Sequence, residues 1–244
     1  MELTGKVALI TGSTGGIGGE AARLIAASGA HVVVSGRNPE RGAATVRAIT
    51  ETGGSARFVP AELTDLTSLR RLAEEAGEVD ILVNNAALFP GGPTTSQDVE
   101  TFDAALAANI RAPYFLTAAL APGMVARGSG SIINVSTMAA RIGMAGLSVY
   151  SATKAALESL TRTWAAEFSP AGVRVNTVAP GPTRTDMVMD TMGEEGAQQV
   201  AKTTLLGRLA APREIAEVIH FLATERAAYL TGATLAADAG RTAV

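Results

Sequence analysis

Two side chains four positions apart could exchange a proton with a substrate oxygen. Tyr150 and Lys154 stand in YSATKAALESL, a stretch whose composition predicts a helix. A separation of four places both side chains on one helix face, about one turn apart. A tyrosine with a pKa of about 10 is a poor base at neutral pH, but a neighbouring ammonium stabilises its phenolate. The pair is therefore a candidate acid–base group for a carbonyl or carbinol oxygen, and the alternative is an exposed tyrosine–lysine pair.

A glycine-rich segment near the N-terminus could hold a dinucleotide. The sequence TGSTGGIG, at 11–18, follows a predicted strand, opens an Ala-rich helix and precedes a second strand, which is the βαβ context that a dinucleotide fingerprint requires. Glycines there allow backbone amides to approach a pyrophosphate at the positive end of a helix. The residues predicted to contact the cofactor are Gly12, Ser13, Thr14, Gly16, Ile17 and Gly18. A merely tight turn is the alternative interpretation.

The end of the second predicted strand selects between the two nicotinamide dinucleotides. It reads VVVSGRN, and no Asp or Glu lies between Ala21 and Asn38 to bind a ribose 2′-hydroxyl. Arg37 can form paired hydrogen bonds with a 2′-phosphate, so the sequence favours NADP over NAD, with Arg37 and Asn38 as cofactor residues. A solvated arginine at the start of a loop is the alternative.

The composition excludes several other kinds of chemistry. The 244 residues carry 20 Lys plus Arg against 23 Asp plus Glu, and this mild negative charge argues against nucleic acid as a partner. There is no Cys, and the two histidines lie far apart at positions 31 and 220, so we expect no metal site and no histidine relay. No segment reads as a targeting peptide or a membrane span. The expected location is the cytoplasm.

Short β-branched runs alternate with longer Ala- and Leu-rich stretches along the whole chain. This pattern predicts one α/β domain over residues 1–244, a doubly wound parallel sheet with helices on both faces. The expected strands are Val7–Thr11, His31–Ser35, Ala56–Pro60, Asp80–Asn84, Ser131–Ser136, Val173–Val178 and Thr234–Ala237. Helices are expected after the Asn38-Pro39 pair, at Leu66–Ala76 and from Pro212 to about Thr224. Only 185–206, with three methionines and two glycines, resists assignment; it is either a mobile flap over a pocket or an ordinary connection.

These motifs together resemble the short-chain dehydrogenase/reductase family over essentially the whole chain. Beside the glycine-rich loop and YSATK, the resemblance includes NNAA at 84–87, Asn109, INVSTM at 133–138, PGPTRT at 180–185 and LTGATLAADAG at 230–240. It implies a single-domain Rossmann fold with a seven-stranded parallel sheet. It also implies a homotetramer built through the middle helices and the C-terminal segment, with Ala- and Leu-rich faces near 104–108 and 155–168.

The resemblance also implies roles for individual residues. Tyr150 is the expected general acid in reduction and general base in oxidation, while Lys154 binds the nicotinamide ribose and lowers the tyrosine pKa. Asn109 holds a water in the proton relay. The other residues expected to contact the cofactor are Asn85, Ala86, Glu62, Leu63, Pro180, Gly181, Thr183 and Thr185.

The sequence departs from the family pattern at several positions. The catalytic serine of the family corresponds to Thr137, which follows Ser136; we predict Thr137 as the donor because neighbouring strand positions point to opposite sides. Ala87 and Ala239 replace usual glycines, and Glu62 replaces the commoner aspartate. None of these changes removes the Tyr150–Lys154 pair.

The predicted function is an NADP(H)-dependent oxidoreductase that interconverts a ketone or aldehyde with the alcohol, without a metal. The expected pocket walls suggest an apolar substrate, although each could instead be core: Leu88, Phe89, Pro90, Met138, Met144, Leu147 and Met187. One alternative is a 3-oxoacyl-[acyl-carrier-protein] reductase, which requires a basic landing surface. Its candidate residues are Arg127, Arg141 and Arg184. The other alternative is a non-catalytic NADP-binding regulator.

Overall fold

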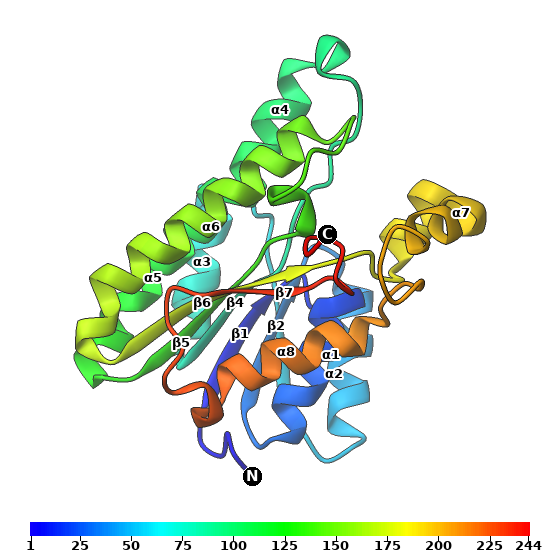
Figure 1. The fold of residues 1–244 in the computed structure, drawn as a ribbon. Coiled ribbons are helices and arrows are strands. Elements are labelled where there is room, and N and C mark those ends of the chain that lie inside the picture. The colour runs from blue at the N-terminus through cyan, green and yellow to red at the C-terminus, as the bar shows by residue number, and fades with distance from the viewer.

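The computed structural model describes residues 1–244, which form one sheet of seven parallel strands between two layers of helices (Figure 1). The strand order is β3-β2-β1-β4-β5-β6-β7. The strands are β1 (Val7–Thr11), β2 (His31–Gly36), β3 (Ser55–Pro60), β4 (Ile81–Asn84), β5 (Gly130–Val135), β6 (Val173–Pro180) and β7 (Thr234–Ala237). The predicted doubly wound fold is confirmed, and each predicted strand is present within two residues of its expected bounds.

Two apolar cores, one on each face of the sheet, explain why the strands are apolar at nearly every position. In β1, Ala8 and Ile10 pack into one core and Leu9 packs into the other. Since successive strand side chains point to opposite faces, a sheet covered on both sides needs apolar residues throughout. The same alternation occurs at Val32 and Val33 of β2.

Eight helices cover the sheet or extend from its edge. They are α1 (Gly16–Ala27), α2 (Pro39–Thr50), α3 (Leu66–Ala76), α4 (Val99–Leu106), α5 (Ala112–Arg127), α6 (Ser148–Phe168), α7 (Asp186–Ala201) and α8 (Pro212–Ala223). Helices α1, α2 and α8 contribute to one core, and α3, α5 and α6 contribute to the other (Figure 1). A π-helical segment, Ala107–Arg111, joins α4 to α5.

Two of the predicted helix starts are formed by side-chain caps, and the third, α8, begins at Pro212 without a side-chain cap from Ala211. Asn38 Oδ1 accepts a hydrogen bond from Arg41 N at 3.0 Å, and Pro39 occupies the first helical position of α2. Asp65 caps α3 by accepting from Thr67 N at 2.9 Å. These starts fix the direction in which each helix leaves its strand.

The segment at 185–206 is mostly helical, which the sequence alone does not indicate. Thr185 caps α7 by accepting from Val188 N, and the helix is kinked at Gly193, whose φ is 64° and ψ −178°. In Figure 1, α7 lies apart from the sheet, beyond the carboxyl ends of the strands. Because the kink interrupts the period and few of its residues are buried, no amphipathic repeat marks it in the sequence.

The strand order creates a crevice between β1 and β4. After β3 the chain crosses to the other side of β1, so the loops after β1 and β4 diverge to opposite faces. Open α/β sheets bind ligands at this point, outside the carboxyl ends of their strands. None of the helices combines the length and hydropathy needed to cross a bilayer.

Candidate active site

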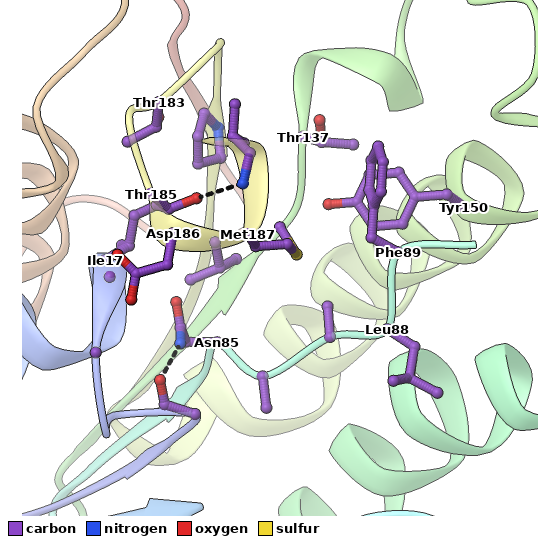
Figure 2. Close-up of a pocket in the computed structure, with 18 of the residues that line it drawn as sticks. Ile17, Asn85, Leu88, Phe89, Thr137, Tyr150, Thr183, Thr185, Asp186 and Met187 are labelled. Atoms are coloured by element: carbon purple, nitrogen blue, oxygen red, sulfur yellow. Dashed lines mark hydrogen bonds between the residues drawn. The ribbon is translucent and has the colours of Figure 1, made fainter. Parts of the chain in front are cut away.

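A cavity of about 780 Å³ lies at the carboxyl ends of the strands (Figure 2). One end is formed by the glycine-rich loop and the ends of β2 and β3, and the other by residues after β4 and β5 and by α6. Residues of α7 cover the side. The volume is in the range of ligand-binding clefts, and the lining joins a polar end to an apolar one.

The glycine-rich loop forms the polar end of the cavity. Gly12 and Gly16 have φ of 64° and 54°, and a Cβ on Gly12 would lie 2.9 Å from Ala86 Cα. Helix α1 begins at Gly16 without a side-chain cap and without an acidic residue in its first turn. Its first amides are therefore free to bind an anion.

Two residues predicted to contact the cofactor instead support the loop from behind. Ser13 is buried; its Oγ donates to Ile10 O at 2.6 Å and accepts from Ser35 N at 2.9 Å. Gly18 packs against Asn85 and Gly12, where no Cβ would fit. Neither lines the cavity, whereas Gly12, Thr14, Gly16 and Ile17 do. The sequence pattern located the glycine-rich loop. It did not distinguish the loop residues that line the cavity from those that hold the loop in place from behind.

Asn85 fastens the glycine-rich loop to the end of β4. Its Nδ2 donates to Thr11 O at 2.9 Å and to Gly12 O at 3.1 Å; Figure 2 shows one hydrogen bond from Asn85 to the neighbouring loop. The backbone amides of Asn85 and Ala86 donate to Thr11 Oγ1, both at 3.1 Å. Both residues line the cavity, and their contact with a cofactor ribose stays a prediction.

The end of the cavity beside β2 and β3 carries charged groups. Arg37, Glu62 and Leu63 line it as predicted, but Asn38 does not, because its side chain is occupied in capping α2. Burial raises the pKa of Glu62, but hydrogen bonds from Thr64 and the charge of Arg37 together hold it below its usual value. This carboxylate stays ionised near neutral pH.

Arg41 is a cavity residue that the sequence did not indicate. It comes from α2, and its Nη2 lies 2.7 Å from where a Cβ on Gly15 would stand. It also pairs with Asp186 at the start of α7, at 3.2 Å between Nη2 and Oδ2. These two residues are 145 positions apart, so only the tertiary structure brings them to the same wall of the cavity.

Thr137 and Tyr150 face one another at the other end of the cavity (Figure 2). Burial raises the pKa of Tyr150 to about 12, and the Thr137 hydroxyl opposes this increase. We expected Lys154 to lower the pKa of Tyr150. In the protein the pKa is raised instead, because burial disfavours the charged phenolate and this is the largest effect. Phe89 packs edge-on against the Tyr150 ring, with centroids 4.7 Å apart.

Lys154 is buried beneath Tyr150, with 2% of its surface exposed. Its Nζ lies 5.9 Å from the centre of the Tyr150 ring and donates to Val135 O at 2.7 Å. An ammonium has three donors, so two remain for another acceptor at the cavity wall. Burial lowers the pKa of Lys154 to about 8.

The neighbouring hydroxyls at 136 and 137 point to different surroundings. Both residues line the cavity, but Ser136 is buried and its hydroxyl donates to Glu158 Oε1 at 2.9 Å. Thr137 is the hydroxyl that interacts with Tyr150. The geometry therefore favours Thr137 over Ser136 as the donor to a substrate oxygen.

Asn109 lies behind the cavity rather than in its wall. It is fully buried in the π-helical segment. Its Oδ1 accepts from Leu88 N at 2.8 Å, and its Nδ2 donates to Leu88 O at 2.9 Å and to Thr153 Oγ1 at 3.1 Å. This side chain holds the loop after β4 against α6, and the water-binding role stays a prediction.

The last segment of the wall follows β6. Pro180, Gly181, Thr183 and Thr185 all line the cavity, and their contact with the cofactor stays a prediction. Among the residues expected to form apolar walls, only Pro90 does not line the cavity; it is buried in the protein. The others line it: Leu88, Phe89, Met138, Met144, Leu147 and Met187.

Comparison with known proteins agrees with this arrangement. A family model described as enoyl-(acyl carrier protein) reductase matches residues 12–242. A solved structure of a short chain dehydrogenase/reductase family protein is 54% identical, with a TM-score of 0.95 and full coverage of both chains. The chain is 38% identical to cis-4-hydroxycyclohexanecarboxylate dehydrogenase of Sinomonas cyclohexanicum, covering 98% of this chain and 97% of that one.

A structure from Agrobacterium tumefaciens, described as 3-oxoacyl (acyl-carrier-protein) reductase with NADP bound, is 31% identical. Its TM-score is 0.93, and the match covers 97% of this chain and 94% of that chain. Sequence motifs, sheet order and overall likeness thus agree along the length of the molecule. The chain belongs to the short-chain dehydrogenase/reductase family and is an oxidoreductase.

Proposed function

We propose that this enzyme uses NADP(H) to interconvert an apolar ketone or aldehyde with the corresponding alcohol. The observation that carries the proposal is that one cavity contains a free helix N-terminus at one end and Thr137, Tyr150 and Lys154 at the other. That distribution fits a dinucleotide with its phosphates on the glycine-rich loop and its reactive ring near Tyr150.

The residues present fit the cofactor at three places. The uncapped first turn of α1 provides amides for the pyrophosphate, and the close approach of Gly12 to Ala86 leaves no room for a side chain there. Lys154 retains two unused donors for ribose hydroxyls. When bound, the reduced nicotinamide supplies the hydride that the carbonyl carbon accepts.

The protein's own residues supply the proton. With a pKa of about 12, Tyr150 is a neutral phenol at pH 7 and can donate its proton to the carbonyl oxygen during reduction. Thr137 donates a hydrogen bond to the same oxygen and stabilises the charge that develops on it. In the oxidation direction, the alcohol oxygen gives its proton to the Tyr150 phenolate while the hydride leaves the carbinol carbon for the oxidised cofactor, and the family resemblance implies that the Lys154 ammonium stabilises this phenolate.

The substrate end of the cavity favours a compact apolar compound. Leu88, Met138, Met144, Leu147 and Met187 form its walls together with Phe89, and the unbranched methionines adapt to irregular shapes. An apolar or aromatic carbonyl compound fits this lining better than a sugar phosphate.

A 3-oxoacyl-[acyl-carrier-protein] reductase is the second candidate, favoured by relatives of that name, one from Rickettsia conorii at 33% identity and the structure from Agrobacterium tumefaciens at 31%. The three arginines considered for the landing surface are occupied, however. Arg184 pairs with Glu194, Arg141 with Glu158, and Arg127 donates to Val79 O at 2.7 Å. A non-catalytic regulator has no observation in its favour, since the proposed catalytic side chains share one cavity.

Replacing Tyr150 by Phe tests the chemistry. We expect turnover of a panel of aldehydes and ketones, followed at the absorbance of NADPH, to fall by about 100-fold or more, because the proton donor is removed. NADPH binding, measured by fluorescence, should be preserved. Wild-type turnover in Tyr150→Phe would contradict the mechanism, and a wild-type protein inert with every carbonyl would contradict the proposed function.

Replacing Arg37 by Asp tests the cofactor preference. A lost charge-assisted contact with the 2′-phosphate should weaken NADPH binding by about 10- to 100-fold, while NADH binding improves. The control is Arg70→Asp, which makes the same charge change on the exposed face of α3. An unchanged ratio of NADPH to NADH affinity in Arg37→Asp would remove Arg37 from the cofactor site.

Two further properties belong to the proposal. We propose a homotetramer, as the family resemblance implies, whose interface includes exposed apolar side chains of α4 and α5. The cytoplasmic location stays a prediction from the sequence.

A further inference from the structure

A buried carboxylate lies directly behind the proposed catalytic residues and has no part in the mechanism described above. Glu158 is on α6, one turn after Lys154, and only 7% of its surface is exposed. It does not line the cavity. A glutamate is rarely buried without a partner, because desolvating its charge is costly, so its contacts indicate what it is held there to do.

Glu158 contacts both sides of the segment that carries Thr137. Its Oε1 accepts from Ser136 Oγ at 2.9 Å, and its Oε2 lies 3.5 Å from Arg141 Nε. Ser136 immediately precedes Thr137, and Arg141 closes the 3₁₀ turn Met138–Ala140 that follows it. The carboxylate therefore joins the two ends of the Thr137 turn to the helix that carries Tyr150.

The remaining contacts make this connection specific. The Ser136 hydroxyl has one proton to donate. Lys154 O lies 3.3 Å from Ser136 Oγ, but Glu158 Oε1 is nearer, at 2.9 Å. Arg141 Nη2 reaches Thr234 O of β7 at 3.5 Å, which ties the turn to the neighbouring edge of the sheet. Thr137 Oγ1 accepts a 3.3 Å hydrogen bond from Ala139 N, and Thr137 O accepts one from Ala140 N at 3.1 Å, so the turn itself determines where this hydroxyl lies.

We infer that Glu158 is a positioning residue that acts through Thr137. Glu158 fixes Ser136 and Arg141, and these residues determine where the Thr137 hydroxyl lies relative to the Tyr150 hydroxyl. The substrate oxygen must be held between these two hydroxyls. This inference rests on the proposed function, since it concerns the same reaction. A small displacement of such a donor is enough to reduce turnover strongly.

A double-mutant cycle between Glu158 and Thr137 tests this inference. We expect Glu158→Ala to lower kcat by about tenfold with little change in KM or NADPH affinity, because Glu158 itself does not line the cavity. If it acts through Thr137, the double variant with Thr137→Ala should be no slower than Thr137→Ala alone, within about twofold. If instead the fold reduction in kcat of the double variant equals the product of the reductions in the two single variants, the two residues act independently and the inference is overturned.

Conservative and matched variants separate positioning from folding. Glu158→Gln keeps an acceptor for Ser136 and should recover most of the turnover lost in Glu158→Ala, while Glu167→Ala, on the exposed side of α6, should change nothing. If Glu158→Ala does not fold, the same cycle is run with Arg141→Ala, whose side chain is partly exposed. Loss of NADPH binding in Glu158→Gln would also overturn the inference.

The proposed function can fail separately. An unaffected Tyr150→Phe would contradict the proposed chemistry, whatever Glu158 does. If the Tyr150→Phe variant is inactive and the separate Glu158→Ala variant is fully active, the proposed function stands and only the role of Glu158 is overturned.

Discussion

The ammonium of Lys154 is buried at a cost in folding free energy. A pKa lowered from 10.5 to about 8 corresponds to a penalty on the order of 3 kcal/mol for keeping the charged form inside the protein. Below about pH 8 the Lys154 amine is charged in both the folded and the unfolded protein, so the folded state bears the whole cost of burying the charge. As the pH rises toward 10.5, the folded protein holds fewer protons than the unfolded chain, so the penalty disappears.

Lys154→Met should therefore stabilise the protein while removing activity. We expect the free energy of unfolding at pH 7, measured with urea, to increase by about 1–3 kcal/mol, with the difference from wild type narrowing above pH 8. Lys202→Met, at an exposed position, is the matched control and should have little effect. A less stable Lys154→Met would show that the hydrogen bond to Val135 O outweighs the buried charge.

At the residue scale, the sequence predicted the pairs that are set by local spacing. Tyr150 and Lys154 share a helix face because they lie four residues apart. Thr137 rather than Ser136 faces Tyr150 because the backbone is still extended at Thr137, after the end of β5, so that neighbouring side chains point to different sides. It could not predict Arg41–Asp186 or Ser136–Glu158, since these contacts depend on how separate elements pack.

At the scale of elements, the kink in α7 controls the shape of the substrate end. Gly193 combines a φ of 64° with a ψ of −178°, a conformation that is essentially restricted to glycine, although a Cβ there would meet nothing within 4 Å. The ion pair of Arg184 with Glu194 spans this kink, with contacts of 2.8 and 3.0 Å. This exposed ion pair joins the residue before the Thr185 cap to the second half of the helix, while Met187 and Met192, in the first half, lie on the cavity wall.

Gly193→Ala should change substrate binding more than cofactor binding. Relief of the strain must alter the kink, so we expect KM for the carbonyl substrate to rise several-fold, with the NADPH dissociation constant nearly unchanged. The control is Gly53→Ala, which introduces a Cβ at a similarly positive φ of 82° with open space around it, away from the cavity. Equal effects of both variants on KM would contradict a role for the kink.

The elements that the sequence predicted well are those with a repeated apolar pattern. The strands and α3 or α8 each bury one consistent set of positions. Helix α7 buries only Ala197 and Ala201, and its kink breaks the helical period, so neither periodicity nor composition distinguished it from a loop.

At the scale of the whole molecule, one helical layer carries exposed apolar side chains outside both cores. The Ala-rich face predicted for assembly near 104–108 is largely internal, since Ala105, Ala107 and Ala108 are buried within the chain. Larger apolar residues of the same helices are exposed instead: Val99, Phe102, Tyr114, Phe115 and Val125. Helices α4 and α5 lie on the same side of the molecule, beside α6 (Figure 1).

These residues predict how the proposed tetramer would be disrupted. Tyr114 and Phe115 are adjacent, with ring centroids 5.4 Å apart, and are 45% and 47% exposed. Aromatic side chains at the centre of an interface contribute a large part of its binding energy, and a charge buried there without a partner is strongly unfavourable. Phe115→Glu should therefore convert a species of about four times 24.8 kDa into a smaller one.

Light scattering coupled to size-exclusion chromatography measures this change directly. Thr50→Glu, which adds the same charge to the exposed end of α2, should leave the mass unchanged. The mutated side chain does not line the cavity, so a smaller Phe115→Glu species that still binds NADPH would show that the site is complete in one chain. A wild-type protein that elutes as a monomer would refute the proposed assembly, and an unchanged tetramer in Phe115→Glu would place the interface on another surface.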